Sequence, residues 1–166
     1  MTSDRAHRAV RLKALRCYFG VSVVANLIWE FLQLPLYTLW QTGTRKEQVF
    51  AVLHCTIGDA MIAGFSLLAA LGLFAHRMWP NARVAPVYAA SLAFGVAYTL
   101  FSEWLNTSVR GSWAYSDLMP VVPVIGTGLA PLMQWLLIPT LAQWIAVGRP
   151  PWVDREFRAF ETAKGE

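Results

Sequence analysis

Charged residues are scarce in this sequence and unevenly distributed. Only 14% of the 166 residues are Asp, Glu, Lys or Arg, whereas an ordinary soluble domain has about 25%. Lys and Arg are absent from the stretches 17–44, 47–76, 84–109 and 111–148. Each stretch is longer than the roughly 20 mostly apolar residues that cross a bilayer. This distribution excludes an ordinary soluble domain and predicts an all-α, polytopic membrane protein.

Cysteine is scarce as well, since the chain has only Cys17 and Cys55. The two fall in different predicted helices, and neither has a second cysteine at metal-ligand spacing. We therefore expect no disulfide. No metal site or cofactor is predicted either: His54 could reach a shared metal with Glu30 or Glu103, but no ligand-spacing motif supports such a site. The net charge of +4 comes mainly from the two ends of the chain. Membrane topology accounts for that charge, so nucleic-acid binding is not predicted.

The apolar stretches predict four membrane-spanning helices that form one bundle and one domain over residues 1–166. Pro35, near the end of the first helix, should kink it or loosen its last turns, and Pro139 should kink the fourth. Residues 107–126 are too apolar for a plain surface loop and predict a structured outer loop on or in the membrane. We place the four spans at about 14–39, 48–75, 85–106 and 127–147.

The two ends of the chain carry most of its positive charge. Five basic residues between Arg5 and Arg16 have helical spacing, which favours a short interfacial helix on anionic lipid. The apolar run that follows is too long for a signal peptide, so an uncleaved first span is predicted. In the charged tail, the pattern Val153, Phe157 and Phe160 favours a short amphipathic helix.

The distribution of Lys and Arg predicts the orientation in the membrane. If both ends lie inside, only Arg45, Lys46 and Arg110 of the 14 basic residues fall on the outer side. We therefore expect a multi-pass protein of the plasma (inner) membrane with both termini in the cytoplasm.

One acid lies well inside the first span. Glu30 has Asn26 at i−4 and Gln33 at i+3, so the three polar groups share one helix face. An ionisable group at membrane depth is costly unless it faces the bundle interior or a wet cavity, and it usually marks a functional site. The alternative is a protonated acid that only bonds neighbouring helices together.

The other spans place polar groups in the same outer half of the bundle. His54 and Asp59 lie in the second span and Glu103 in the third, and with Glu30 they are the catalytic candidates. His54 and Asp59 are about 140° apart on a helical wheel, so they should not share one small ligand. His54 and the aromatic residues also fit interfacial or packing roles. The ligand-binding candidates are Asn26, Gln33, Asn106, Trp113, Tyr115, Asp117, Gln134 and Trp135.

Together these residues predict an acidic pocket that opens to the extracytoplasmic side. Apart from Asn26, the inner halves of the spans look like nearly pure hydrocarbon. Since no basic residue pairs with the acids, at least one acid should be protonated or share its proton. Such a group could act as a general acid, a proton carrier or a cation site.

Two short segments carry a resemblance to a known family. The segment Glu30-Phe-Leu-Gln-Leu-Pro-Leu-Tyr and the segment Trp135-Leu-Leu-Ile-Pro139 are similar to those of EXPERA-type proteins, which include the emopamil-binding sterol isomerases and the sigma-2 receptor. The first loop is shorter here, and the family's paired carboxylates are not matched at clear positions. The resemblance implies a four-helix membrane bundle in which Glu30, Asp59 and Glu103 move protons onto a lipid-like substrate.

These observations leave three functional hypotheses. The first is a protein that binds, or modifies by acid/base chemistry, an isoprenoid, sterol-like compound or lipid; an enzyme of this kind would be an isomerase or cyclase. The second is a proton- or cation-coupled transport component. The third is a non-catalytic assembly or accessory subunit. The expected partners are membrane lipids or a lipophilic small molecule, with a homo-oligomer or a membrane-protein partner left open.

Overall fold

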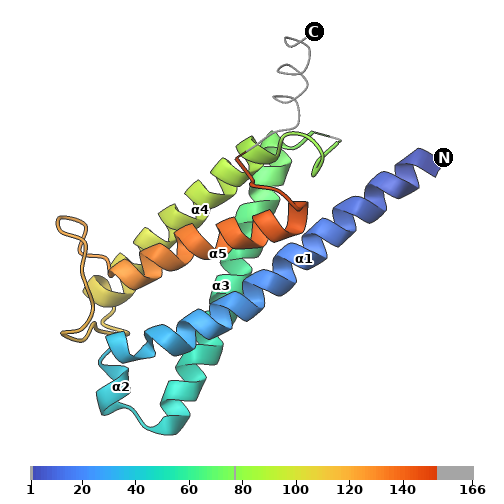
Figure 1. The fold of residues 1–166 in the computed structure, drawn as a ribbon. Helices are drawn as coiled ribbons and strands as arrows, with labels where there is room; N and C mark the ends of the chain where they lie inside the picture. Colours follow the sequence, from blue (N-terminus) through green and yellow to red (C-terminus); the bar gives the residue numbers. More distant parts are fainter. Residues whose placement is uncertain (1, 77, 153–166) are drawn as a thin grey trace.

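A computed structural model of the chain describes residues 2–76 and 78–152 (Figure 1). Within these residues the fold is all-helical, with four helices long and apolar enough to cross a membrane. The fold class is confirmed to this extent. The long helices are α1 (Thr2–Gln33), α3 (Arg45–Phe74), α4 (Val84–Trp104) and α5 (Leu129–Val147), and the short ones are η1 (Leu34–Leu36), α2 (Leu39–Thr42) and the π-helix η2 (Leu105–Val109).

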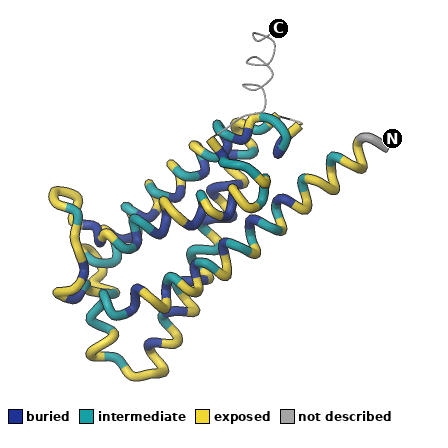
Figure 2. Tube along the Cα trace, viewed as in Figure 1, coloured by how far each residue is buried: buried dark blue, intermediate teal, exposed yellow. Residues whose placement is uncertain are grey.

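The basic N-terminal segment is not a separate interfacial helix. It is the first part of α1, which begins at Thr2 and continues without a break into the apolar segment. Before Ala14 the described side chains are mostly exposed, and this part of α1 projects beyond the bundle (Figures 1 and 2). No proline or glycine interrupts the segment before Gly20, so nothing local ends the helix there.

The chain changes direction at Pro35, as predicted. α1 ends at Gln33, and Pro35 lies in the 3-10 turn η1, which leads to the four-residue helix α2. α3 then begins with a capping box, in which Glu47 N–H donates to Thr44 Oγ1 at 3.3 Å and Thr44 N–H donates to Glu47 Oε2 at 2.7 Å. These bonds satisfy backbone donors at the start of α3 and keep the connection from α1 short.

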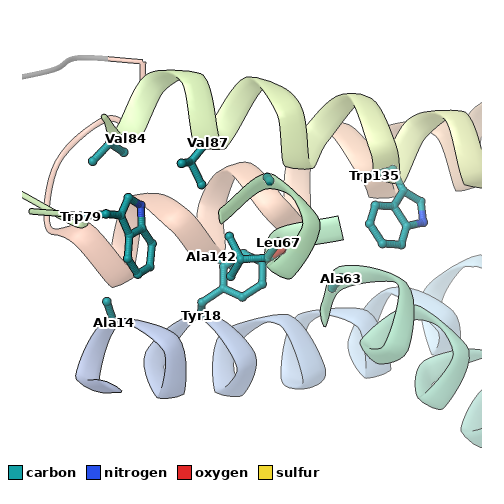
Figure 3. Close-up of a cluster of buried hydrophobic side chains, with 10 residues drawn as sticks. Ala14, Tyr18, Ala63, Leu67, Trp79, Val84, Val87, Trp135 and Ala142 are labelled. Atoms are coloured by element: carbon teal, nitrogen blue, oxygen red, sulfur yellow. The ribbon is translucent and has the colours of Figure 1, made fainter. Parts of the chain in front are cut away.

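The four long helices form a ring in which α1 and α4 each pack against α3 and α5. Close contacts depend on small residues, as in many membrane helix pairs. A Cβ at Gly95 of α4 would lie 2.3 Å from the Trp135 ring of α5, and one at Gly64 of α3 would lie 3.1 Å from Phe19 of α1. The buried core combines such contacts with aromatic and aliphatic side chains (Figure 3).

Apolar side chains also cover the outside of the ring. Phe31 of α1, Phe65 of α3 and Leu73 of α3 are each at least two-thirds exposed. Helices that are apolar on both their inner and outer faces are typical of membrane spans or the interior of a much larger protein.

Two loops close the ends of the ring. Between α3 and α4, Trp79 is buried, and Arg149 Nη2 donates to the backbone oxygens of Pro80 and Asn81 at 3.1 Å. At the other end, the segment after η2 is structured, as predicted. The candidate tail helix containing Val153, Phe157 and Phe160 lies outside the described residues.

The structured outer loop is attached to the end of α1. Tyr37 and Tyr115 form an antiparallel bridge. Thr38 N–H donates to Ala114 O at 3.0 Å, and Ser116 N–H donates to Leu36 O at 2.9 Å. The redirected chain after Pro35 therefore supplies the backbone groups that hold this loop over the ends of the helices.

Candidate functional site

The amide of Gln134 lies at the centre of a polar cluster formed by three helices. Its Nε2 atom is 2.9 Å from Asn26 Oδ1 and 3.1 Å from Glu30 Oε1, both on α1. It is also 2.8 Å from Asp59 Oδ2 on α3. Gln33 Nε2 donates to Glu30 Oε1 at 2.7 Å and to Gln134 Oε1 at 3.3 Å. We call these five residues the acid cluster.

Helical spacing explains how the acid cluster is assembled. Asn26, Glu30 and Gln33 are all buried on one face of α1, as their i−4 and i+3 positions predict. α5 presents Gln134, and α3 presents the half-buried Asp59. The structure thus brings together two of the four catalytic candidates and three of the ligand-binding candidates.

The acid cluster has more acceptor oxygens than its amides can supply with hydrogens. A glutamine amide carries two N–H hydrogens, yet Gln134 Nε2 faces three oxygens within 3.1 Å. The carboxyl groups of Glu30 and Asp59 are also close to each other, since both contact Gln134 Nε2. A carboxyl–carboxyl hydrogen bond requires a proton on one of its oxygens. No Lys or Arg occurs in 17–44, 47–76 or 111–148 to neutralise the acids, so the pair is expected to share one proton.

Glu103 belongs to a second polar group at the outer-loop end of α4. The Tyr115 hydroxyl donates to Glu103 Oε2 and accepts from the Gly128 backbone N–H at 2.9 Å. The Trp113 indole lies beside the same carboxylate, but its N–H does not reach hydrogen-bond geometry. The Glu103 carboxylate is close enough to the acid cluster for the charges to interact. The π-helix η2 begins two residues after Glu103, and such turns are frequent at functional sites.

Tyr37 lies between these two polar groups. Its ring centroid is 5.6 Å from that of Tyr115, and its phenol is near the carboxyl groups of Glu103 and Glu30. Burial, reinforced by the Glu103 carboxylate, holds the pKa of the Tyr37 phenol well above its usual range, so it remains neutral. Tyr37 was not among the predicted site residues, because helical periodicity does not extend past Pro35.

The structure does not bring His54 to the acid cluster. Its ring stacks on Phe50, with centroids 5.6 Å apart, on an exposed face of α3. The five-residue spacing between His54 and Asp59 already predicts this divergence, since it separates them by about 140° around the helix.

Three other ligand-binding candidates are not part of the acid cluster. Asp117 is exposed on the outer loop. The Asn106 amide donates to Ser102 O at 2.8 Å, one turn earlier on its own helix. Trp135 packs in the apolar core against Gly95. The position of Trp135 fits the packing role that was the alternative for the aromatic residues.

The half of the bundle farther from the outer loop, which was predicted to be the inner half, is more polar than predicted. Gln143 Nε2 donates to Ser91 Oγ at 2.6 Å, and both side chains are buried. The Tyr88 and Thr140 hydroxyls are 3.0 Å apart. The expectation of nearly pure hydrocarbon in this half is wrong, because these neutral groups of α4 and α5 pair with each other. Isolated serine and glutamine residues gave too weak a sequence signal to reveal the pairs.

Two empty spaces adjoin the acid cluster. The first is a narrow gap beside Asn26 and Gln134 that does not admit water. The acid cluster residues therefore contact one another directly and do not line a hollow of ligand size. The second is a groove of about 400 Å³ between α1 and α5, open to the outside of the bundle.

Among residues 2–76 and 78–152, no group of three or more His, Cys, Asp or Glu side chains could hold a metal ion. No protein-family model matches the chain, and neither the curated proteins nor the solved structures give a match. Any function assigned to the candidate site therefore rests on the geometry of its residues.

Proposed function

We propose that this chain is a membrane-inserted protein that binds a lipophilic molecule, such as an isoprenoid, a sterol-like compound or a lipid, and modifies it by acid/base chemistry. The observation that carries the proposal is the contact between Glu30 and Asp59. These acids come from separate helices, contact the same Gln134 amide and lie in the stretches 17–44 and 47–76, which contain no Lys or Arg. The resemblance to EXPERA-type proteins favours the same assignment.

An acid pair that shares one proton supplies an acid and a base in one place. The protonated carboxyl can give its proton to an alkene carbon, and the ionised carboxylate can remove a proton from a neighbouring carbon. This exchange moves a double bond or closes a ring without oxidation or reduction. An isomerase or cyclase needs only these two proton transfers, and general acid/base groups typically contribute 10²–10⁴-fold to such steps.

The proposal also includes an orientation in the membrane. Both termini would lie in the cytoplasm, since only three of the 14 Lys and Arg residues fall on the opposite side. Four spans return the chain to its starting side, which agrees with this arrangement. The acid cluster would then be nearer the extracytoplasmic surface, beneath the outer loop.

The proposal is tested by extracting lipids from purified protein. We expect the wild type to retain an apolar compound and Glu30→Gln to retain roughly tenfold less, which corresponds to about 1.4 kcal/mol of binding free energy. Glu47→Gln is the matched control, because Glu47 is an exposed acid that only caps α3. If no apolar compound accompanies the wild type, or if Glu30→Gln retains the same amount, the proposal is contradicted.

A proton- or cation-coupled transport component is the second candidate. It is favoured by the buried polar residues that continue from the acid cluster toward the inner end, namely Ser22 and the Ser91–Gln143 pair. Flux in proteoliposomes separates the two functions. Transport requires a proton or cation flux that falls in Glu30→Gln, whereas the enzyme hypothesis predicts no flux in either protein.

A further inference from the structure

His54 lies on the face of α3 that is turned away from the bundle. The buried residues of α3, such as Thr56, Ala63 and Leu67, lie on the opposite side of the helix. From Val49 to Phe74, a stretch that the structure describes in full, His54 is the one exposed residue with a polar side chain. It is therefore a single polar group on an otherwise apolar surface.

The imidazole lies within the apolar part of α3. Gln48 is the last residue of the polar helix start, and His54 follows it after six residues, or about 9 Å along the axis. Its ring stacks on Phe50 and makes no hydrogen bond within the described residues. Ionisable groups at membrane depth are costly when they face lipid, and they usually face protein or water. The outward face of α3 therefore requires a neighbouring molecule that offers the imidazole a hydrogen-bond partner.

The same face has room for a closely packed helix. Gly58 follows His54 by about one turn and Gly72 follows it by five full turns, so both glycines lie on its side of α3. A Cβ at either glycine would meet no atom within 4 Å. The exposed side chains of Met61 and Phe65 lie between them. Small residues at such positions let the backbone of a second helix approach closely.

We propose that this face of α3 binds the same face of a second copy of the chain, with one His54 ring donating a hydrogen bond to the other. A neutral imidazole has one N–H donor and one nitrogen acceptor, so two identical rings complement each other without a further residue. Histidine is among the side chains that form hydrogen bonds between membrane helices. The inference takes only the membrane insertion from the proposed function.

Symmetry favours a second copy over a different protein. Two copies inserted in the same direction are related by a two-fold axis along the membrane normal, so each His54 meets its counterpart at the same depth. A different protein would have to supply its own polar group at that depth. The exposed residues of α3 from Val49 to Phe74 include no Asp, Glu, Lys or Arg that would select one.

Disulfide cross-linking in liposomes tests which face is paired. Native Cys17 and Cys55 are replaced by alanine, and one cysteine is introduced by Met61→Cys on the His54 side of α3 or by Val24→Cys on α1. The two positions are matched, because Met61 is 56% and Val24 is 58% exposed. At a high lipid-to-protein ratio, where chance encounters are rare, we expect severalfold more covalent dimer from Met61→Cys than from Val24→Cys.

Substitution at His54 tests the contact between the two rings. Pairing is measured by energy transfer between donor- and acceptor-labelled copies in liposomes. His54→Leu removes the hydrogen bond and should weaken pairing roughly threefold, the factor expected for an average bond between membrane helices. His54→Gln keeps both a donor and an acceptor and should pair nearly as the wild type does. Gly58→Leu fills the space needed for close approach and should weaken pairing severalfold.

Two results would overturn the inference. Equal cross-linking of the Met61 and Val24 variants, or unchanged pairing in His54→Leu, would leave His54 as a residue that faces lipid. In native membranes, cross-linking of Met61→Cys to a different protein in place of a dimer would show that another chain covers this face.

The results also separate this inference from the proposed function. Glu30→Gln should pair as the wild type does, because Glu30 is buried in the acid cluster. Pairing in a protein that retains no apolar compound supports the His54 contact while the proposed function fails. A compound that depends on Glu30, in a protein that does not pair, supports the function and rejects the contact between copies.

Discussion

Helix α5 carries two deeply buried glutamines in different settings. Gln134 and Gln143 are 2% and 3% exposed, and they are about 14 Å apart along the helix axis at 1.5 Å per residue. Gln134 contacts oxygens of Asn26, Glu30 and Asp59. Gln143 contacts one neutral hydroxyl, that of Ser91.

The comparison shows that burial of a polar group does not by itself indicate chemistry. The Gln143–Ser91 pair is a satisfied neutral contact between two helices, and such contacts average about 0.6 kcal/mol in membrane proteins. The Gln134 amide instead holds two acids close together where no cation is available. The excess of acceptors, and not the depth of burial, distinguishes the candidate site.

The largest loss of stability is expected from a leucine substitution at Gln134, compared with the same substitution at Gln143. Gln134→Leu removes the amide donor that Asn26 and Asp59 contact and one of the two amide donors to Glu30, and it should lower the free energy of unfolding by about 3 kcal/mol. Gln143→Leu should lower it by about 1 kcal/mol. SDS-induced unfolding of the purified proteins measures both values. Equal losses would remove the distinction between the two regions.

A smaller effect on the free energy of unfolding is expected at Asp59. There the choice of the new side chain should matter more than the loss of the negative charge. Asp59→Leu removes the carboxyl group that Gln134 contacts and that lies beside Glu30, and it should lower the free energy of unfolding by about 2 kcal/mol. Asp59→Asn can still donate to Glu30, as a protonated acid does, and should stay within about 1 kcal/mol of the wild type. If the leucine and asparagine variants unfold alike, the carboxyl–carboxyl contact contributes nothing.

Tyr115→Phe should have an effect of about 1 kcal/mol, because it removes the bonds to Glu103 and Gly128. Burial, and then the bond to Glu103, raise the pKa of Tyr115 above its usual value. A raised folded-state pKa means that the phenol's contribution is complete below about pH 10, the unfolded value, and declines above it. The difference between Tyr115→Phe and wild type should therefore be constant between about pH 6 and about pH 9.

The smallest effect is expected for His54→Ala. His54 is exposed and contacts the exposed Phe50 ring, so the free energy of unfolding should change by less than about 0.5 kcal/mol. The amount of co-purified compound should not change either. A large loss of that compound would return His54 to the candidate site.

Regular spacing made part of this structure predictable. The four long helices follow from stretches without Lys or Arg, and the shared face of Asn26, Glu30 and Gln33 follows from helical geometry. The i,i+5 spacing of His54 and Asp59 also showed that one of them would face elsewhere. In each case the prediction depends only on the spacing of residues within one helix.

Contacts between elements were not predictable from the sequence. The position of Tyr37 depends on the turn at Pro35 and on the backbone pairing of Tyr37 with Tyr115 of the outer loop. The pairing of Gln134 with Asp59 and of Gln143 with Ser91 depends on how α5 is rotated relative to its neighbours. One α5 face could not be distinguished from another, because apolar residues surround the whole helix.

The central claim is that Glu30 and Asp59 share a proton at neutral pH. Infrared difference spectroscopy at pH 7 detects the C=O stretch of a protonated carboxylic acid directly. We predict such a band in the wild type and in Glu47→Gln, and its loss in the double variant Glu30→Gln/Asp59→Asn. A wild-type spectrum without this band, or a band that persists in the double variant, would contradict the account.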